Sequence, residues 1–346
     1  MKQKLLLTFF LFLSLSSLFA QATAILESDT AFAKQFDIKE YFNVEITPEQ
    51  RSQYKSEIEK LTVIIAAHPN ETSAYINRGA YFSYLGFHVN AIKDYDEAFF
   101  ANGGLASLAS LVKTNSFPEI SSNERIGSPI ARPSKILCIG LNYAKHAKET
   151  GAAIPTEPIL FLKSSSSLSG PYDPIMIPKG SEKTDWEVEL AVVIGKKASY
   201  VSEAEAMDYV AGYVLHNDVS ERAYQLERGG TWDKGKGCDT FAPLGPWLVT
   251  KDEIENPHEL RLWLSLNGKM MQDENTNDLI FNIPQLISYS SQFMTLLPGD
   301  VISTGTPAGV GLGFSPNIYL KAGDVVELGI DGLGTSKQEV IAYQKH

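Results

Sequence analysis

The sequence is poor in cysteine and histidine, with two cysteines and six histidines among 346 residues. One cysteine pair in a chain of this length cannot form a disulfide framework. Cys138 and Cys238 lie in apolar or glycine-rich stretches, so we expect two buried free thiols. The sequence also lacks a His-rich or Cys-paired ligand pattern, which makes zinc a disfavoured metal.

Clusters of basic residues are also lacking. The net charge is -11, and the Lys and Arg residues are scattered along the chain. Such a charge balance excludes nucleic acid and an anionic membrane as expected partners. With 44% hydrophobic and 21% charged residues and no low-complexity tract, the composition is that of a globular protein with room for two domains.

Long hydrophobic runs are lacking except at the N-terminus. There, Lys2 and Lys4 precede an apolar run, and small residues follow near Ala20. This layout predicts a signal peptide over residues 1–22, with cleavage between Ala20 and Ile25. An uncleaved anchor is the alternative, although the run is short for a membrane span. We therefore expect an exported protein, periplasmic or secreted, with no membrane contact after signal cleavage.

Residues 36–103 have a helical pattern. Thr47 is a candidate cap before Pro48 at a first helical position. Further on, small and aromatic residues have the spacing of one tetratricopeptide (TPR) repeat, namely Gly79, Phe82, Gly86, Ala91, Tyr95 and Ala98. One repeat cannot bury its own face, so this TPR-like helical hairpin predicts a surface for a protein partner. Residues 104–130 are expected to be a linker.

Residues 131–346 have short β-branched runs separated by Gly and Pro, which predict mostly strands. Two stretches have a helical pattern, at residues 202–215 and 282–294. The chain is therefore predicted to be α+β, with a small all-α region preceding a strand-rich domain.

Acidic residues are concentrated within one predicted strand, residues 185–195. Side chains alternate along a strand, so Asp185, Glu187 and Glu189 would share one face. Asp218 follows another apolar stretch. Carboxylates in apolar surroundings tend to bind a cation, and an all-oxygen set suits Mg²⁺, Mn²⁺ or Ca²⁺. The alternative is an edge strand with its acids in solvent.

Other polar residues lie in the same half of the chain. His146 and Glu149 would share a helix face as a base and its orienting carboxylate. Lys236 lies between glycines, where a backbone can approach a ligand closely. Residues 304–311 form a loop of hydroxyls and amides that could bind a carboxylate. Each feature alone is more often structural, and their joint occurrence favours a catalytic site.

Seven motifs along residues 126–346 resemble the fumarylacetoacetate hydrolase family, in that family's order. They are "ILCIGLNYAKHAKETG", "FLKSSSSLSGP", "DWEVELAVVIGK", "VAGYVLHNDVSER", "GKGCDTFAPLGPWLVT", "NTNDLIFNIPQLISYSSQFMTLLPGDVISTGTPAGVG" and "LKAGDVVELGIDGLGT". The resemblance implies a mixed β-sandwich roll as the catalytic domain at 131–346, a homodimer, and a divalent metal. It does not cover the helical region.

The resemblance also implies roles for individual residues. The three carboxylates of the metal site match Glu187, Glu189 and Asp218, and the dyad of the family's mobile lid matches His146 and Glu149. Lys236 would help to neutralise an oxyanion. Positions near the substrate match Arg222, Gln225, Lys163 and Thr306. The family's usual "KP" is "KS" at residues 163–164, a departure that leaves the metal site unchanged.

These roles imply a metal-dependent hydrolase that cleaves a C–C bond in acylpyruvate-like 2,4-dioxo acids, giving pyruvate and a second acid. The stretch "ERGGTWDKGKGCDTF" resembles members that act on deoxy sugar acids. A 2-oxo acid decarboxylase, lyase or isomerase with the same metal is the nearest alternative, because all of these reactions stabilise an enolate. An inert scaffold protein that works through its TPR-like repeat is a further alternative.

Overall fold

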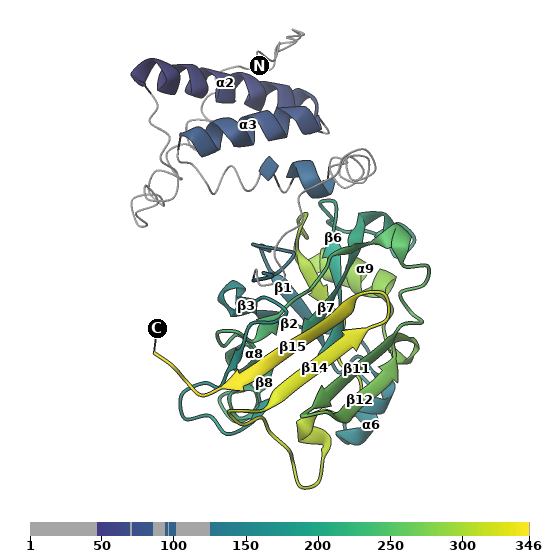
Figure 1. Ribbon diagram of the computed structural model, residues 1–346. Coiled ribbons are helices and arrows are strands. Elements are labelled where there is room, and N and C mark those ends of the chain that lie inside the picture. Colours follow the sequence, from purple (N-terminus) through teal and green to yellow (C-terminus); the bar gives the residue numbers. More distant parts are fainter. Residues whose placement is uncertain (1–46, 70, 86–93, 96, 102–124, 346) are drawn as a thin grey trace. The chain divides into compact units, whose positions relative to one another are not determined.

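The computed structural model describes residues 47–69, 71–85, 94–95, 97–101 and 125–345 (Figure 1). The chain divides into two compact units, Met1–Ser116 and Phe117–His346. The predicted signal peptide and residues 104–124 of the predicted linker lie outside the described residues. Within the described residues, no helix has both the length and the apolar character that a membrane crossing requires.

The first unit contains the predicted helices. Helix α2 (Pro48–Ala67) starts as expected, because Thr47 and Gln50 each bond the backbone N–H of the other, forming a capping box. Helix α3 (Thr72–Tyr84) packs against it, and a π-helix, η2, spans Glu97–Ala101. The two helices are confirmed, whereas their assignment to a TPR repeat stays a prediction. Gly86 and Ala91 of that pattern lie outside the described residues.

Two larger sheets make up most of the second unit. The six-stranded sheet has the order β10-β7-β6-β13-β1-β2, with strands Val249–Thr250, Val210–Asn217, Val188–Ile194, Val301–Ser303, Ile136–Gly140 and Ile159–Lys163. The five-stranded sheet has the order β12-β11-β14-β15-β4, with strands Lys269–Asn275, Arg261–Leu266, Val325–Ile330, Gly334–Ile341 and Ile175–Met176. Both sheets mix parallel and antiparallel pairs, so the α+β class is confirmed.

Smaller elements complete this unit. Two short sheets pair β3 (Leu168–Ser169) with β9 (Ala242–Pro243) and β5 (Thr184–Asp185) with β8 (Ser220–Glu221). The α-helices are α6 (Ala144–Glu149), α7 (Arg222–Leu226), α8 (Asp233–Lys236) and α9 (Ile283–Phe293). Short 3₁₀ turns are η3 (Ser165–Ser167), η4 (Ala206–Tyr209), η5 (Lys251–Glu253), η6 (Thr276–Asp278) and η7 (Gly311–Gly313).

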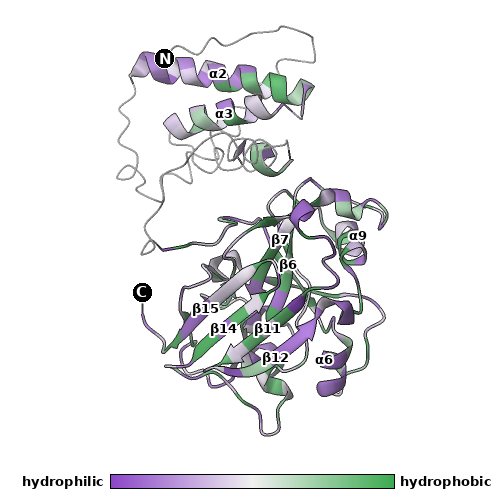
Figure 2. Cartoon of the chain, turned by 45° about the vertical axis from the view of Figure 1, so that its right-hand side comes forward, coloured by the Kyte–Doolittle hydropathy of each residue, from purple (hydrophilic) through white to green (hydrophobic). Residues whose placement is uncertain are grey.

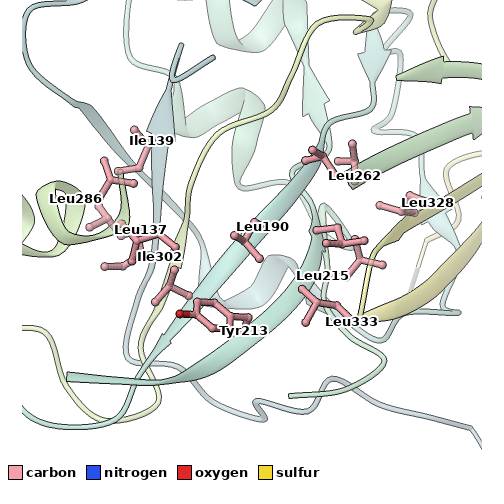
Figure 3. Packing of buried hydrophobic residues seen from close by; sticks show 14 of the residues in the cluster. Leu137, Ile139, Leu190, Tyr213, Leu215, Leu262, Leu286, Ile302, Leu328 and Leu333 are labelled. Carbon is pink, nitrogen blue, oxygen red and sulfur yellow. The ribbon is translucent and has the colours of Figure 1, made fainter. Parts of the chain in front are cut away.

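The main core lies on one face of the six-stranded sheet. Leu137, Ile302 and Val192 are direct neighbours across β1, β13 and β6, so they share that face. They belong to one buried cluster that includes Leu286 of α9 and Leu328 of β14 (Figure 3). Strands β6 and β7 are therefore largely hydrophobic in Figure 2, whereas the edge strand β12 is hydrophilic. The opposite face of the six-stranded sheet remains available for polar side chains.

Two predictions of secondary structure need correction. Residues 202–215 are not a helix, because η4 is followed directly by strand β7. Since β7 is buried along its whole length, its apolar run shows no alternation that would identify a strand. The predicted strand over 185–195 is divided between β5 and β6, because Thr184–Asp185 pairs with β8 instead of β7. By contrast, α9 matches the helix predicted at 282–294 and carries its own capping box.

The cysteines are both free thiols. Cys138 is buried, as expected, but Cys238 is only partly buried. Burial nevertheless raises the pKa of the Cys238 thiol to about 11.

Candidate functional site

The polar face of the six-stranded sheet is set by strand register. Glu189 of β6 lies opposite His216 of β7, and Ser303 of β13 lies opposite Ala191. Because Ala191 is two residues from Glu189, all of these side chains project to the same face. The sheet thus buries apolar groups on one side and gathers titratable groups on the other.

Three carboxylates meet at the end of this face. One oxygen from each of Glu187, Glu189 and Asp218 lies within 4.8 Å of the others, and all three residues are buried. The arrangement is fixed by the backbone, because the Asp218 N–H donates to the Glu187 carbonyl at 2.9 Å. The Glu187 N–H donates to the Asn217 side chain at 3.1 Å. The structure therefore brings together the acids that the sequence singled out from two separate strands.

Three basic side chains surround these acids. Lys236 Nζ contacts Glu187 at 2.7 Å and Asp218 at 2.8 Å. Lys163 Nζ contacts Asp218 at 2.6 Å, and Arg222 contacts Glu187 at 2.7 Å. Burial opposes ionisation of Asp218, but the two ammonium groups outweigh it and lower the pKa of that carboxyl. Burial likewise opposes the charge on Lys236, and the neighbouring carboxylates raise its pKa.

Asp185 does not join the carboxylate triad but anchors a loop beside it. Its carboxylate accepts the backbone N–H groups of Gly311 at 2.7 Å and Leu312 at 3.0 Å. It also accepts Arg222 Nε at 2.8 Å. Because Arg222 in turn contacts Glu187, Asp185 links this loop to the acid cluster. We therefore assign Asp185 a structural role that alternation along the strand could not define.

The donor set fits a divalent cation. Asp185, Glu187, Glu189 and Asp218 are four buried carboxylates, while Lys163, Arg222 and Lys236 supply three positive charges. Within the described part of the chain, Glu189 forms no ion pair with a basic residue. Burial, together with the charges of Asp218 and Glu187, raises its pKa well above the usual range. A cation held by Glu187, Glu189 and Asp218 would supply the missing charge, and three carboxylate oxygens suit Mg²⁺, Mn²⁺ or Ca²⁺.

The predicted base and its carboxylate are also in contact. His146 and Glu149 lie on α6, which lies beside β12 (Figure 1). His146 Nδ1 is 2.8 Å from Glu149 Oε1. The Gly309 N–H donates to both Glu149 oxygens, at 3.1 and 2.9 Å. Gly309 belongs to the same loop as Gly311 and Leu312, which bond to Asp185. This loop therefore contacts both Glu149 of the dyad and Asp185 beside the acid cluster.

Two predicted substrate positions have engaged side chains. Thr306 Oγ1 donates to the Val188 carbonyl at 3.0 Å and accepts from Gln272 at 2.8 Å. Gln225 accepts a bond from Arg222 at 3.0 Å. Thr306 and Gln225 are both buried, and their side-chain oxygens Oγ1 and Oε1 are bonded within the protein. Their roles in substrate binding stay predictions.

Sequence reasoning missed two polar residues at this site. Ser303 Oγ donates to Glu189 at 2.5 Å, and His216 Nδ1 lies 2.6 Å from the same hydroxyl. His216 is adjacent to "ND" in "LHND", which was the available signal, but its partner Ser303 is remote in sequence. Burial lowers the pKa of His216 to about 3, so its imidazole is neutral at physiological pH.

Comparison with known proteins identifies the second unit. The sequence profile described as "Fumarylacetoacetate (FAA) hydrolase C-terminal" matches residues 135–341, more than half of the chain. A Burkholderia cenocepacia protein, named only provisionally as a hydrolase, is 56% identical over 239 residues. That match covers 69% of this chain and 84% of the relative.

Solved structures show the same fold. Maleylpyruvate hydrolase from Sphingobium sp. SYK-6 matches with a TM-score of 0.60 and 31% identity, covering 72% of this chain and 86% of that one. The 2-hydroxyhepta-2,4-diene-1,7-dioate isomerase from Mycobacterium marinum matches with a TM-score of 0.56 and 39% identity, covering 64% of this chain and 79% of that one. The chain therefore belongs to the fumarylacetoacetate hydrolase family of enzymes.

Proposed function

We propose that this protein is a metal-dependent hydrolase that cleaves a C–C bond in acylpyruvate-like 2,4-dioxo acids, including sugar-derived ones. The observation that carries the proposal is the buried triad of Glu187, Glu189 and Asp218, with ligand oxygens within 4.8 Å. A Mg²⁺ or Mn²⁺ ion bound there would polarise the substrate's 2-oxo group and stabilise the enolate that leaves. The maleylpyruvate hydrolase among the solved structures supports this substrate class.

The protein's own residues supply the base. Glu149 is 2.8 Å from His146 Nδ1, so it can accept a hydrogen bond from Nδ1–H, which leaves Nε2 free to take a proton from water. The attacking water adds to the 4-oxo carbon, and the bond between that carbon and C3 then breaks. The pyruvate enolate takes up a proton, and the second product is a carboxylic acid. The Gly309 N–H holds Glu149 in place for this role.

Lys236 has a second role besides balancing the negative charges of Glu187 and Asp218. Its ammonium contacts two of the three ligand carboxylates, and its raised pKa keeps it charged. Such a buried cation can stabilise negative charge that develops on a substrate oxygen. We propose that Arg222 and Lys163 act mainly on the acids, holding Glu187 and Asp218 in position.

Isomerisation is a second candidate, because the Mycobacterium marinum structure is that of an isomerase with 39% identity to this chain. An isomerase would use the same enolate chemistry but would need no attacking water. The two activities are separated by the products: only hydrolysis incorporates oxygen from H₂¹⁸O into the released acid. A decarboxylase would release CO₂ instead of pyruvate.

The test is a panel of 2-oxo and 2,4-dioxo acids assayed with Mg²⁺ or Mn²⁺, recording pyruvate and CO₂ separately. We expect pyruvate release that is abolished by chelation and by Glu187→Ala. His146→Gln should lower kcat about 10²- to 10⁴-fold. His68→Gln is the matched control, because His68 is exposed at the end of α2 in the other unit. Full activity in Glu187→Ala, or CO₂ as the only product, would show the proposal to be wrong.

The remaining sequence predictions are kept as proposals. We propose export through the signal peptide at residues 1–22, which mass spectrometry would test by finding a mature N-terminus between Ala20 and Ile25. We also propose a homodimer, which light scattering would test through the molar mass in solution. A molar mass no greater than the 38.1 kDa of one full-length chain would contradict the dimer.

A further inference from the structure

Each carboxylate of the triad is held by donors of the protein. Arg222 Nη1 contacts Glu187 Oε1 at 2.7 Å, and Lys163 Nζ contacts Asp218 Oδ1 at 2.6 Å. The other oxygens of Glu187 and Asp218 both face Lys236 Nζ. Both oxygens of these two carboxylates therefore contact basic side chains, and a cation would share Glu187 Oε2 and Asp218 Oδ2 with Lys236.

Glu189 differs from these two carboxylates, because its donors are neutral and both contact the same oxygen. Its Oε2 accepts the Ser303 hydroxyl at 2.5 Å and the Gly305 N–H at 3.0 Å. Among the residues that the structure describes, Oε1 has no hydrogen bond or ion pair, so this oxygen is left for a cation. Two donors on one oxygen hold the carboxylate in a single orientation, with Oε2 turned towards the protein.

His216 contacts the Ser303 hydroxyl and so helps to determine which group donates each of these hydrogen bonds. The Ser303 hydroxyl has one proton, and it donates that proton to Glu189 when the carboxylate is ionised. The contact between Ser303 Oγ and His216 Nδ1, at 2.6 Å, must then be donated by the imidazole. His216 is fully buried and its Nε2 has no hydrogen-bond partner among the described residues. Its Nδ1–H therefore serves to orient Ser303.

We propose that Ser303, oriented by His216, restricts Glu189 to one ligand oxygen and so makes the site select Mg²⁺ or Mn²⁺ over Ca²⁺. The inference rests on the proposed metal site. Ca²⁺ takes six to eight oxygens and commonly binds carboxylates through both oxygens, whereas Mg²⁺ takes six in octahedral geometry. Glu189 could bind through both oxygens only by giving up its bonds to Ser303 and Gly305.

The test is direct metal binding, because activity would not separate selectivity from chemistry. Isothermal titration of the full chain with Mg²⁺, Mn²⁺ and Ca²⁺ gives the Kd for each ion. We expect Ser303→Ala to weaken Mg²⁺ and Mn²⁺ binding roughly 10- to 100-fold, as for other residues that orient metal ligands. Ca²⁺ binding should weaken less, because Glu189 becomes freer to offer both oxygens. The ratio of Kd for Ca²⁺ to Kd for Mg²⁺ should therefore fall by about tenfold.

A pair of His216 variants tests the orienting role. His216→Asn places an amide donor near the Nδ1 position and should retain the wild-type ratio, whereas His216→Leu should lower it in the same direction as Ser303→Ala. Ser290→Ala is the matched control, because Ser290 is a buried serine on α9 whose hydroxyl has no hydrogen-bond partner in the described part of the chain. It should leave all three Kd values unchanged. Thermal unfolding without metal confirms that each variant is folded.

The outcomes separate this inference from the proposed function. If wild type binds Mg²⁺ and Glu189→Gln abolishes binding, the metal site stands. An equal loss for Ca²⁺ and Mg²⁺ in Ser303→Ala, or no loss, would then overturn the selectivity role alone. If wild type binds none of the three ions, or if Glu189→Gln has no effect, the metal site itself is wrong.

Discussion

Asp185→Asn tests the anchor between the loop and the acid cluster. The carboxylate is fully buried and all of its contacts are donors, so an amide NH₂ in either orientation faces another donor. Removing one partner of a buried ion pair costs about 3–5 kcal/mol. Arg222 keeps Glu187 and Gln225 as partners, which places the loss at about 3 kcal/mol, the lower end of that range.

The assay is urea and thermal unfolding followed by tryptophan fluorescence. All four tryptophans lie in the second unit, so the signal reports that unit alone: Trp186, Trp232, Trp247 and Trp263. A loss of about 3 kcal/mol lowers Tm by roughly 6–12 °C in a unit of this size. Asp273→Asn is the control, because Asp273 pairs with Arg261 at the surface and should leave the midpoint unchanged. A loss below about 1 kcal/mol for Asp185→Asn would refute the reasoning.

Two further predictions concern reactivity and the loop. Alkylation of Cys238 by iodoacetamide should be about 100-fold slower at pH 8 than for a free cysteine and should rise tenfold per pH unit up to pH 9, because burial disfavours the thiolate. Cys238→Ser should abolish the labelling, and a plateau below pH 9 would contradict the raised pKa. Gly309→Ala should destabilise the protein more than Gly323→Ala, because a Cβ at 309 would lie 2.0 Å from the Met271 carbonyl oxygen, whereas nothing lies within 4 Å at 323. The control Gly323→Ala carries only backbone strain of roughly 1–3 kcal/mol, and equal unfolding midpoints for the two variants would contradict the steric argument.

Local sequence signals predicted several elements correctly. The caps at Thr47 and Asn282 and the prolines that follow them define the starts of α2 and α9, because a capping interaction depends on residues within one turn. The spacing of His146 and Glu149 likewise predicted their contact on one helical turn. Strand β7 was wrongly predicted to be part of a helix. It is buried on both faces, so its sequence lacks the alternation of apolar and polar residues that identifies a strand.

The sequence by itself determined the candidate acids, the oxygen chemistry of the site and the family, because these depend on residue types and their order along the chain. Only the tertiary structure decided what balances the acids. Lys163, Arg222 and Lys236 come from three separate elements, and Ser303 reaches Glu189 across 114 residues of chain. The physical reason is that strand register and sheet order bring these groups together, and neither is encoded by a local pattern. The same register turned Asp185 away from the triad and left Glu189 without a basic partner among the described residues, the feature that most favours a bound cation.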